Sequence, residues 1–461
     1  MKRGMDDRSP EVSTAEEAPP AEGDVAGASE DRATEPSAED RLASPEEAFL
    51  LNAARIARGV KVAEDLADEA GHVLARRGQV LDVATAERIH RAGAHTRLQL
   101  RLPTRIDRHR LRERFLALPE RSPDVAALAG RLPVKDMLSK VLNRFKMSAG
   151  VVDLLTLLNL RFPEVFEETL LGAWLTIVLA DEIDLPRAEQ DAAFQASLLR
   201  DVGLLFVTPR LVDAEDPNRL GRLDRQQLRS HARISSTLAA QTEGVSEEAA
   251  LAVEWHHARV DGTGYPPKPA ELELPLYAQL VGFTDALAAA RLDPATPGAS
   301  LARMQRVLVL QLEAFHVGVL GAFRKLTAGL DPSANDPDEL DTRATLVEVM
   351  LHRAKRMESD LDELEDELDS GALKRKVPAG SPVPRIARRL IRMMRESGHG
   401  SSEMTWWLKS VKAGRDDIDW GELIDVDLQQ RAIEKELLRL KQAVEEVAPW
   451  TRREILGPEL L

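Results

Sequence analysis

Histidines and aspartates are the residues of this chain best suited to hold a metal ion, and their spacing is uneven. Of ten histidines, none lies between His109 and His231. His231 is followed by the adjacent pair His256 and His257, and Asp285 lies further on in the apolar stretch VGFTDALAAA. Imidazole and carboxylate groups are ligands that Fe, Mn and Zn accept. These residue types are therefore suited to holding a metal ion.

Two short segments near this set bear on the same chemistry. The segment SLLRDVGLLF, residues 197–206, places Asp201 directly after Arg200. The segment DGTGYP, residues 261–266, follows the histidine pair, and its glycines and proline predict a loop that needs positive φ angles. Contact with a ligand or a partner is a second role for the loop residues Asp261, Gly262, Gly264, Tyr265 and Pro266.

Together these segments resemble the HD-GYP domain, a bacterial family associated with hydrolysis of cyclic di-GMP. The string WHHARVDGTGYP at residues 255–266 is similar to the family pattern HHExxDGxGYP. Asp285 lies ten residues past Pro275, as in the family, and His231 lies where a third histidine belongs. The resemblance covers about residues 50–330. It implies one metal site formed by Asp201, His231, His256 and His257, and an adjoining site that includes Asp285.

The chain departs from the family at the adjoining site. Arg200 stands where the histidine of a His-Asp dyad belongs, and no histidine lies near Glu168–Thr169, where the first family histidine should fall. Arginine offers no lone pair and keeps its charge, so it cannot bind a metal ion. We therefore expect no intact catalytic site and no pair of metal ions. Binding of one ion stays open, as does replacement of the missing histidine by Glu164, Glu167 or Glu168.

Other positions leave further alternatives open. Leu204 and Gln279 replace a lysine and an arginine of the family, which weakens the case for tight nucleotide binding, and Ala258 replaces a glutamate. His231 taken alone fits a helix surface, and Asp201 fits an ion pair with Arg200. Asp285, if buried, needs either a metal ion or a hydrogen-bond network, because an unpaired buried charge is costly.

The predicted fold class is mostly α, with an HD-type all-α helical bundle between a small α+β module and a helical C-terminal region. Residues 107–330 are assigned to the degenerate HD-GYP domain. Apolar residues at three- and four-residue spacing predict several of its helices. The clearest are Leu170–Ala180, Ala192–Leu199, Gln226–Ala240 and Glu247–Trp255.

The N-terminal part divides into two predicted segments. Residues 1–45 are rich in Ala, Pro, Glu, Ser and Asp, and this composition predicts a disordered acidic leader. Residues 50–105 are predicted to form the α+β module. Its expected elements are a strand Val60–Leu66, a pairing of His72–Ala75 with Gln79–Leu81, a helix Thr85–Arg91 and a strand Arg97–Leu102.

Residues 340–461 are predicted to be helical. An acidic helix carries an apolar stripe, a linker Lys376–Pro384 follows, and a basic helix comes next with arginines at 385, 388, 389, 392 and 395. This arginine stripe fits a solvated face, a site for phosphate or an acidic partner, or a contact with the acidic helix. Trp406-Trp407 fits a packing anchor. The apolar stripes, Met357–Leu368 and Ile433–Val444, fit packing within the chain or a homodimer.

Composition narrows the classes of function. The net charge of −15 disfavours a nucleic-acid-binding protein. The absence of cysteine excludes disulfides and thiolate chemistry and fits the cytoplasm. No apolar run is long enough to span a membrane, and the first residues lack the apolar core of a secretory signal.

Three hypotheses follow. The first is a protein of cyclic di-GMP signalling with weak or no catalysis, acting as a binding or interaction module. The resemblance implies cyclic di-GMP and GGDEF- or PilZ-type signalling proteins as its partners. The second is an active metal-dependent cyclic di-GMP phosphodiesterase that uses the retained half of the site. The third is a scaffold without a ligand. The expected cofactor is one Fe, Mn or Zn ion, or none.

Overall fold

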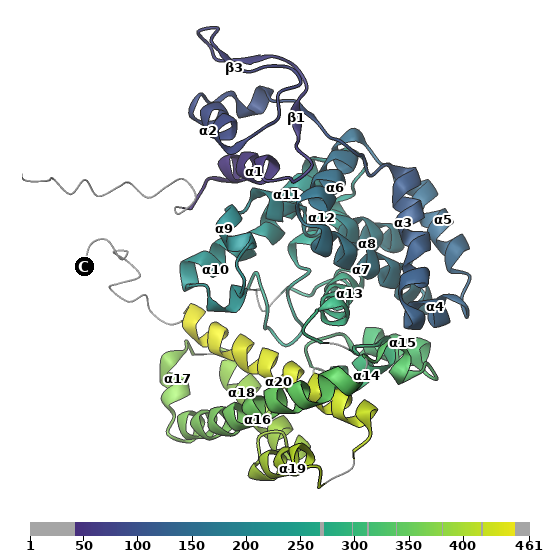
Figure 1. Ribbon diagram of the computed structural model, residues 1–461, viewed down its shortest axis with the longest axis vertical. Helices are drawn as coiled ribbons and strands as arrows, with labels where there is room; N and C mark the ends of the chain where they lie inside the picture. Colours follow the sequence, from purple (N-terminus) through teal and green to yellow (C-terminus); the bar gives the residue numbers. More distant parts are fainter. Residues whose placement is uncertain are drawn as a thin grey trace, which may run out of the picture.

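The computed structural model is mostly helical, and the predicted fold class is confirmed (Figure 1). It describes residues 42–267, 272–296, 298–310, 313–337, 339–379, 381–415 and 418–447. The segment 1–41, which makes up nearly all of the predicted acidic leader, lies outside these residues. In the described parts of the chain, no helix combines the length and the apolar character needed to cross a membrane.

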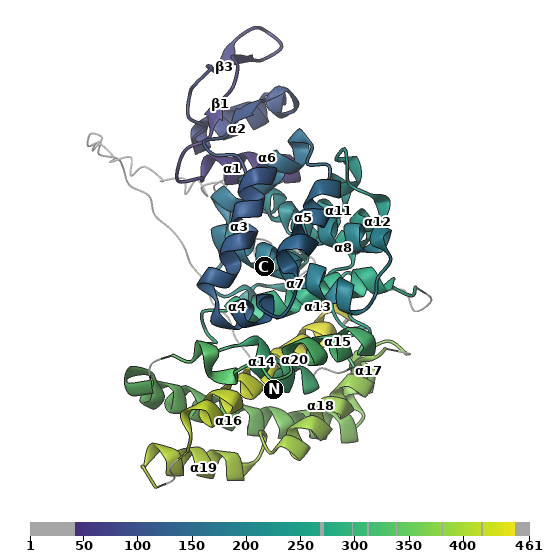
Figure 2. The same ribbon diagram turned by 90° about the vertical axis from the view of Figure 1, so that its right-hand side faces the viewer.

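The small N-terminal module lies at one end of the molecule (Figures 1 and 2). Its β1 and β4 pair antiparallel, as do β2 and β3. Asp82 caps α2 by accepting a hydrogen bond from the backbone N–H of Thr85. The elements are α1 (Pro45–Ala54), β1 (Lys61–Val62), β2 (Leu66–Ala67), β3 (Val73–Ala75), α2 (Val83–Arg91), η1 (Ala94–Arg97) and β4 (Leu100–Arg101).

The strand pairing in this module differs from the prediction. The segment predicted as one strand is divided between β1 and β2, which belong to different sheets. Val80 bridges to Lys61 of β1 and not to β3, so the predicted second pairing is wrong. Helix α1 was not predicted because Leu50–Ala53 are all buried, and a helix buried around its whole circumference lacks an amphipathic pattern. Asn52 docks α1 on the helical core by donating to the carbonyl oxygens of Leu205 and Val207.

The central bundle is built around α7, which is buried at every residue from Thr169 to Ala180. The hydroxyl of Thr176 lies 2.9 Å from that of Ser197 in α8 and 2.7 Å from that of Thr284 in α13. These hydrogen bonds tie three helices together at one level of the core. Arg200 and Asp285 follow Ser197 and Thr284 closely in sequence, so the same network positions them.

The helices of this part begin with α3 (Arg108–Arg121), α4 (Pro123–Ala129), α5 (Val134–Arg144), α6 (Ala149–Arg161), α7 (Pro163–Glu182), α8 (Arg187–Leu199), η2 (Val202–Phe206), α9 (Pro209–Val212) and η3 (Pro217–Arg219). They continue with α10 (Arg222–Arg229), α11 (His231–Gln241), α12 (Glu247–Glu254), α13 (Leu276–Leu292), α14 (Leu301–Val309), α15 (Val317–Thr327) and η4 (Pro332–Asn335). The single helix predicted over Gln226–Ala240 is two helices, divided at Ser230. The Ser230 hydroxyl bonds to the carbonyl oxygen of Gln227, a local bond that competes with regular helix.

The C-terminal helices form a layer below the bundle in both views (Figures 1 and 2). They are α16 (Glu339–Asp369), α17 (Ala372–Lys376), α18 (Val383–Ser397), α19 (Ser402–Lys412) and α20 (Trp420–Val447). Met357 and Leu361 of α16 share a core with Ile433 and Leu437 of α20, so the predicted apolar stripes pack within the chain. Trp407 packs against the neighbouring core and Trp406 is exposed.

Candidate metal centre

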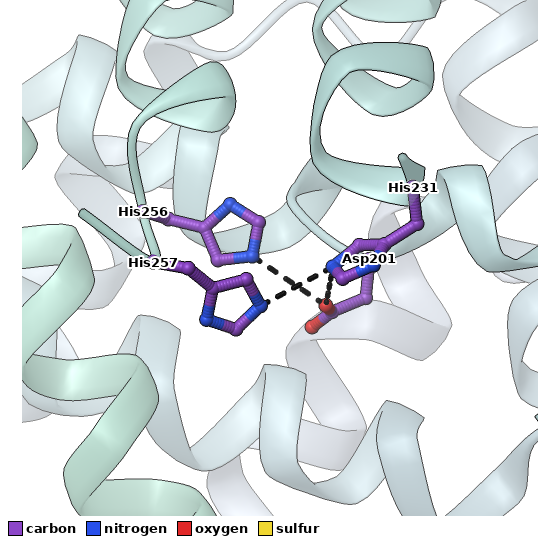
Figure 3. A group of neighbouring side chains, drawn as sticks. All are labelled: Asp201, His231, His256 and His257. Carbon is purple, nitrogen blue, oxygen red and sulfur yellow. Dashed lines mark hydrogen bonds and ion pairs between the residues drawn. The ribbon is translucent and has the colours of Figure 1, made fainter. Parts of the chain in front are cut away.

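Four side chains from three parts of the bundle converge on one point. Asp201 follows α8, His231 begins α11, and His256 and His257 follow α12. One ligand atom from each lies within 4.8 Å of the others (Figure 3). His231 Nε2 is 3.7 Å and His256 Nε2 is 3.8 Å from Asp201 Oδ1. These are the four residues that the sequence motif grouped into one site.

Hydrogen bonds on the far side of each ring orient the imidazoles. Nδ1 of His231 lies 2.8 Å from the Leu228 carbonyl oxygen, and Nδ1 of His256 lies 2.6 Å from that of Val253. A carbonyl oxygen can only accept, so each Nδ1 carries the proton and donates it. Each Nε2 then presents its lone pair to the centre of the cluster. Orientation of this kind is typical of metal-binding histidines.

His257 is oriented by a carboxylate. Its Nδ1 lies 3.3 Å from Asp285 Oδ2, and its Nε2 lies 3.2 Å from His231 Nε2. With Nδ1–H donating to Asp285, the two facing Nε2 atoms both bear lone pairs and repel one another. A cation among them would remove that repulsion. Asp285 therefore lies behind His257 in this arrangement and supports the cluster from outside.

The donor set fits a divalent metal ion. His256 is fully buried, and its Nε2 has no hydrogen-bond partner among the described residues, a costly state for a polar atom. Burial lowers the pKa of His256 to about 4, so its imidazole is neutral at physiological pH and ready to bind a metal. Three nitrogens and one carboxylate oxygen suit Zn, Fe or Mn.

Arg200 fills the space beside this cluster. Its side chain is completely buried, and its Nε lies 3.1 Å from Asp201 Oδ2 and 2.9 Å from Asp285 Oδ1. Asp201 thus faces the imidazoles with one oxygen and the guanidinium with the other. The two alternatives that the sequence left for Asp201, ion pair and metal ligand, are geometrically compatible.

The remaining edges of the guanidinium are also bound. Nη1 donates to the Ser197 carbonyl oxygen at 2.8 Å, and Nη2 donates to that of Glu168 at 3.3 Å. Gly172 makes room for the group, because a Cβ at that position would lie 3.0 Å from Nη1. A glycine inside a helix costs about 1 kcal/mol of stability relative to alanine. Gly172 therefore lowers the stability of α7 and leaves room for the guanidinium.

Of the three glutamates considered as substitutes for the missing histidine, only Glu168 is coupled electrostatically to the cluster. Glu167 pairs with Arg114 and Arg121 instead, and Glu164 is exposed. Burial, followed by repulsion from Asp201 and Asp285, raises the pKa of Glu168 to about 7. At neutral pH this carboxyl is therefore close to half protonated.

The loop after the histidine pair covers the cluster. The ring centroid of Tyr265 lies 4.4 Å from that of His257, with the planes tilted by 38°, and the guanidinium of Arg229 lies over the Tyr265 ring at 4.9 Å. Gly264 has φ of +85°, and a Cβ there would lie 2.0 Å from the His257 carbonyl oxygen, so only glycine fits. Gly262 also has a positive φ, and Pro266 completes the turn. The predicted structural role of the loop is confirmed.

Asp261 of the same loop bonds to Thr263 within the loop and to helix α18. Its Oδ1 accepts hydrogen bonds from the backbone N–H and the hydroxyl of Thr263. Its Oδ2 accepts from Arg389 of α18 at 2.9 Å, and its carbonyl oxygen accepts from Arg385. The loop thus connects the cluster of Asp201 and the three histidines to the C-terminal helices.

Sequence reasoning missed one supporting residue of the site. Arg259 is buried, and its Nη1 donates to the carbonyl oxygens of His256 and Ala258. Its hydrogen-bond partners are backbone atoms, so the residue types in the sequence do not predict these contacts. Leu204 is buried in the apolar core, and Gln279 donates to the Leu274 carbonyl oxygen. The lysine and arginine that the resemblance implies at these two positions are replaced by these uncharged side chains.

Comparison with known proteins supports the assignment of this region. A search of curated proteins found no match. A family model described as the HD domain matches residues 154–314, a range that includes Asp201, Asp285 and all three histidines of the cluster. The bundle around the candidate metal centre is therefore similar to the HD domain over residues 154–314.

Proposed function

We propose that the chain is a protein of cyclic di-GMP signalling whose HD domain, of HD-GYP type, holds one metal ion and acts as a binding module with little or no hydrolytic activity. The observation that carries the proposal is the guanidinium of Arg200, held between Asp201 and Asp285 where the resemblance calls for a second metal. The HD-GYP assignment itself depends on the string WHHARVDGTGYP.

The ligands of the proposed ion are Asp201, His231, His256 and His257. When bound, such an ion polarises a phosphoryl oxygen and lowers the pKa of water, and a second ion nearby is needed to clamp both the attacking and the leaving oxygen. Asp285 orients His257. Asp201 shares its negative charge between the cluster and Arg200.

Arg200 does not replace the second ion functionally. A guanidinium that assists phosphoryl chemistry must donate to the phosphate. Arg200 is fully buried, and its contacts are with two carboxylates and two backbone carbonyl oxygens of its own chain. It neutralises charge inside the domain and presents no exposed surface to a substrate.

The proposal is tested by metal analysis of protein purified from its host. We expect about one Fe, Mn or Zn ion per chain, lost in His256→Ala, whose removal deletes a ligand of a four-coordinate site. Cyclic di-GMP hydrolysis should fall far below that of an intact HD-GYP domain assayed beside it. Two ions per chain together with comparable rates would contradict the proposal.

The position of Glu168 favours a second candidate, an active metal-dependent cyclic di-GMP phosphodiesterase in which this carboxylate completes the site. This candidate predicts that Glu168→Gln lowers a measurable rate of hydrolysis, with Glu164→Gln as the matched control from the same helix. Calorimetry with cyclic di-GMP separates both candidates from a scaffold that binds no ligand. GGDEF- or PilZ-type partners are part of the proposal for the binding module.

A further inference from the structure

A second charged region lies where α18 faces the loop that follows the histidine pair. A cavity of about 620 Å³ is lined on one side by Arg385, Arg388, Arg389 and Arg392. This volume falls in the range of about 300–1,000 Å³ that is typical of small-molecule sites. The arginine stripe of α18 is therefore one wall of a cavity and not simply a solvated face.

The four arginines are not equally available to a ligand. Arg389 is half-buried and pairs with Asp261, and Arg385 donates to the Asp261 carbonyl oxygen. Arg388 and Arg392 are exposed, and neither forms a hydrogen bond or an ion pair within the described part of the chain. Two neighbouring guanidinium groups thus keep their donors free toward the same cavity.

The rest of the lining combines the apolar side chains of Val260, Phe315 and Val317 with the polar side chains of Asp261, Glu313 and His316. Val260 is 50% exposed and Val317 is 79% exposed, and both line the cavity together with Phe315. Exposed valines beside free arginines form a site of mixed character, with one side for an anion and one side for an apolar or planar group. The acidic residues in the lining are Asp261, which is occupied by Arg389, and Glu313, which lies 3.5 Å from Arg389.

We propose that this cavity binds a phosphorylated small molecule with an aromatic or apolar part, of about the size of a nucleotide. Arg388 and Arg392 contact the phosphate, because guanidinium groups form paired, charge-assisted hydrogen bonds with phosphate oxygens. The apolar part lies against Val260 and Val317. This site is distinct from the metal cluster, and the proposal does not depend on the proposed function.

The test is calorimetry on the full chain with ATP, cyclic di-GMP and inorganic phosphate as probes. We expect at least one of the two nucleotides to bind more tightly than inorganic phosphate. The double variant Arg388→Gln/Arg392→Gln should weaken that binding about tenfold or more, since charge-assisted hydrogen bonds are the stronger kind. Val317→Glu, a change at an exposed position, should weaken it as well.

Two controls separate this site from the rest of the molecule. Arg395→Gln changes an arginine of the same helix that pairs with Glu365 outside the cavity, and it should leave affinity within about twofold, as expected for a charge remote from the ligand. Arg91→Gln changes an arginine of the N-terminal module that pairs with Glu87, and it should leave affinity unchanged as well. Loss of nucleotide binding in either control would place the nucleotide outside the cavity and overturn the proposal.

Other outcomes would also contradict the proposed binding at this cavity. Absence of binding by all three probes at about 1 mM would overturn it, because a weaker site has less than about 4 kcal/mol of binding free energy. So would equal binding of inorganic phosphate and the nucleotides, or a double variant that binds as the parent does. A poly-glutamate peptide that binds where no phosphate compound does would indicate an acidic protein partner instead.

Discussion

Arginine occurs in two opposite settings in this molecule. Arg200 is fully buried between Asp201 and Asp285, with its remaining contacts to backbone carbonyl oxygens. Arg388 and Arg392 are exposed on the wall of a cavity and have no partner among the described residues. Arginine therefore fills the space beside the histidine cluster in one setting and lines a cavity with free hydrogen-bond donors in the other. What differs is whether the protein itself has already used the hydrogen-bond donors.

The difference in burial predicts at which of these arginines a substitution changes the free energy of unfolding. A buried ion pair contributes little net stability, but removal of one partner leaves an uncompensated charge in the core. An exposed charge has water as its partner and costs little to remove. Substitutions around Arg200 should therefore affect folding, and substitutions on α18 should affect only binding.

The largest expected effect is that of Asp285→Ala. It removes the closest carboxylate partner of Arg200 and the group that orients His257, so we expect a loss of about 3–5 kcal/mol in the free energy of unfolding. Urea denaturation of metal-free protein measures it. If this variant does not fold, Asp285→Asn keeps the shape and should still be less stable than the parent.

A matched control for Asp285→Ala is Asp153→Ala. Asp153 pairs with Arg105, and both side chains are about half exposed. This pair should contribute about 1 kcal/mol or less. Equal small losses in the two variants would remove the distinction between the buried and the exposed arginines.

The next effect concerns pH. The pKa of Glu168 is raised in the folded protein to about 7, above its ordinary 4.5, so the folded state binds the proton more tightly than the unfolded state. The contribution of this group is present below about pH 4.5 and is lost as the pH rises through 7. Glu168→Gln should therefore stabilise metal-free protein at pH 8 relative to pH 5, by up to about 3 kcal/mol. A parent and a variant with parallel pH profiles would refute this.

A smaller effect is expected for Gly172→Ala. The new methyl group would lie 3.0 Å from Nη1 of Arg200 in a closely packed core, and we expect a loss of about 1–2 kcal/mol. The control is Gly321→Ala in α15, where a Cβ would meet no atom within 4 Å. There the better helix propensity of alanine should stabilise the protein by up to about 1 kcal/mol. Thermal melts of the two variants should shift in opposite directions.

The sequence predicted the contents of the candidate site better than its surroundings. The four residues of the cluster belong to a sequence motif. The position of Arg200 next to Asp201 predicted an ion pair between these neighbours. The contact between Arg200 and Asp285 joins residues 85 positions apart and depends on how α8 and α13 pack. Gly172 lies in an apolar stretch of α7. The sequence of that stretch does not show that a glycine is needed there to leave room for the side chain of Arg200.

The same limit applies to regions that depend on distant partners. The strand-forming segments of the N-terminal module were located, but one predicted strand is divided between two sheets, and Val80 pairs with Lys61. Strands of two or three residues do not encode such pairings, which depend on tertiary packing. The arginine stripe of α18 was visible as a stripe. Two apolar residues of the same lining, Val260 and Val317, lie far upstream in the sequence, so only the fold shows that the stripe faces a cavity.

The smallest effect on stability is expected for Arg388→Gln/Arg392→Gln. Exposed side chains without partners contribute within about 0.5 kcal/mol, so the melting temperature should stay close to that of the parent. Removal of two like charges on adjacent turns of α18 should even relieve a slight repulsion. Thermal melts at low and at high salt measure this. A clear loss of stability at both salt concentrations would mean that these arginines are structural, and the contrast with Arg200 would then no longer hold.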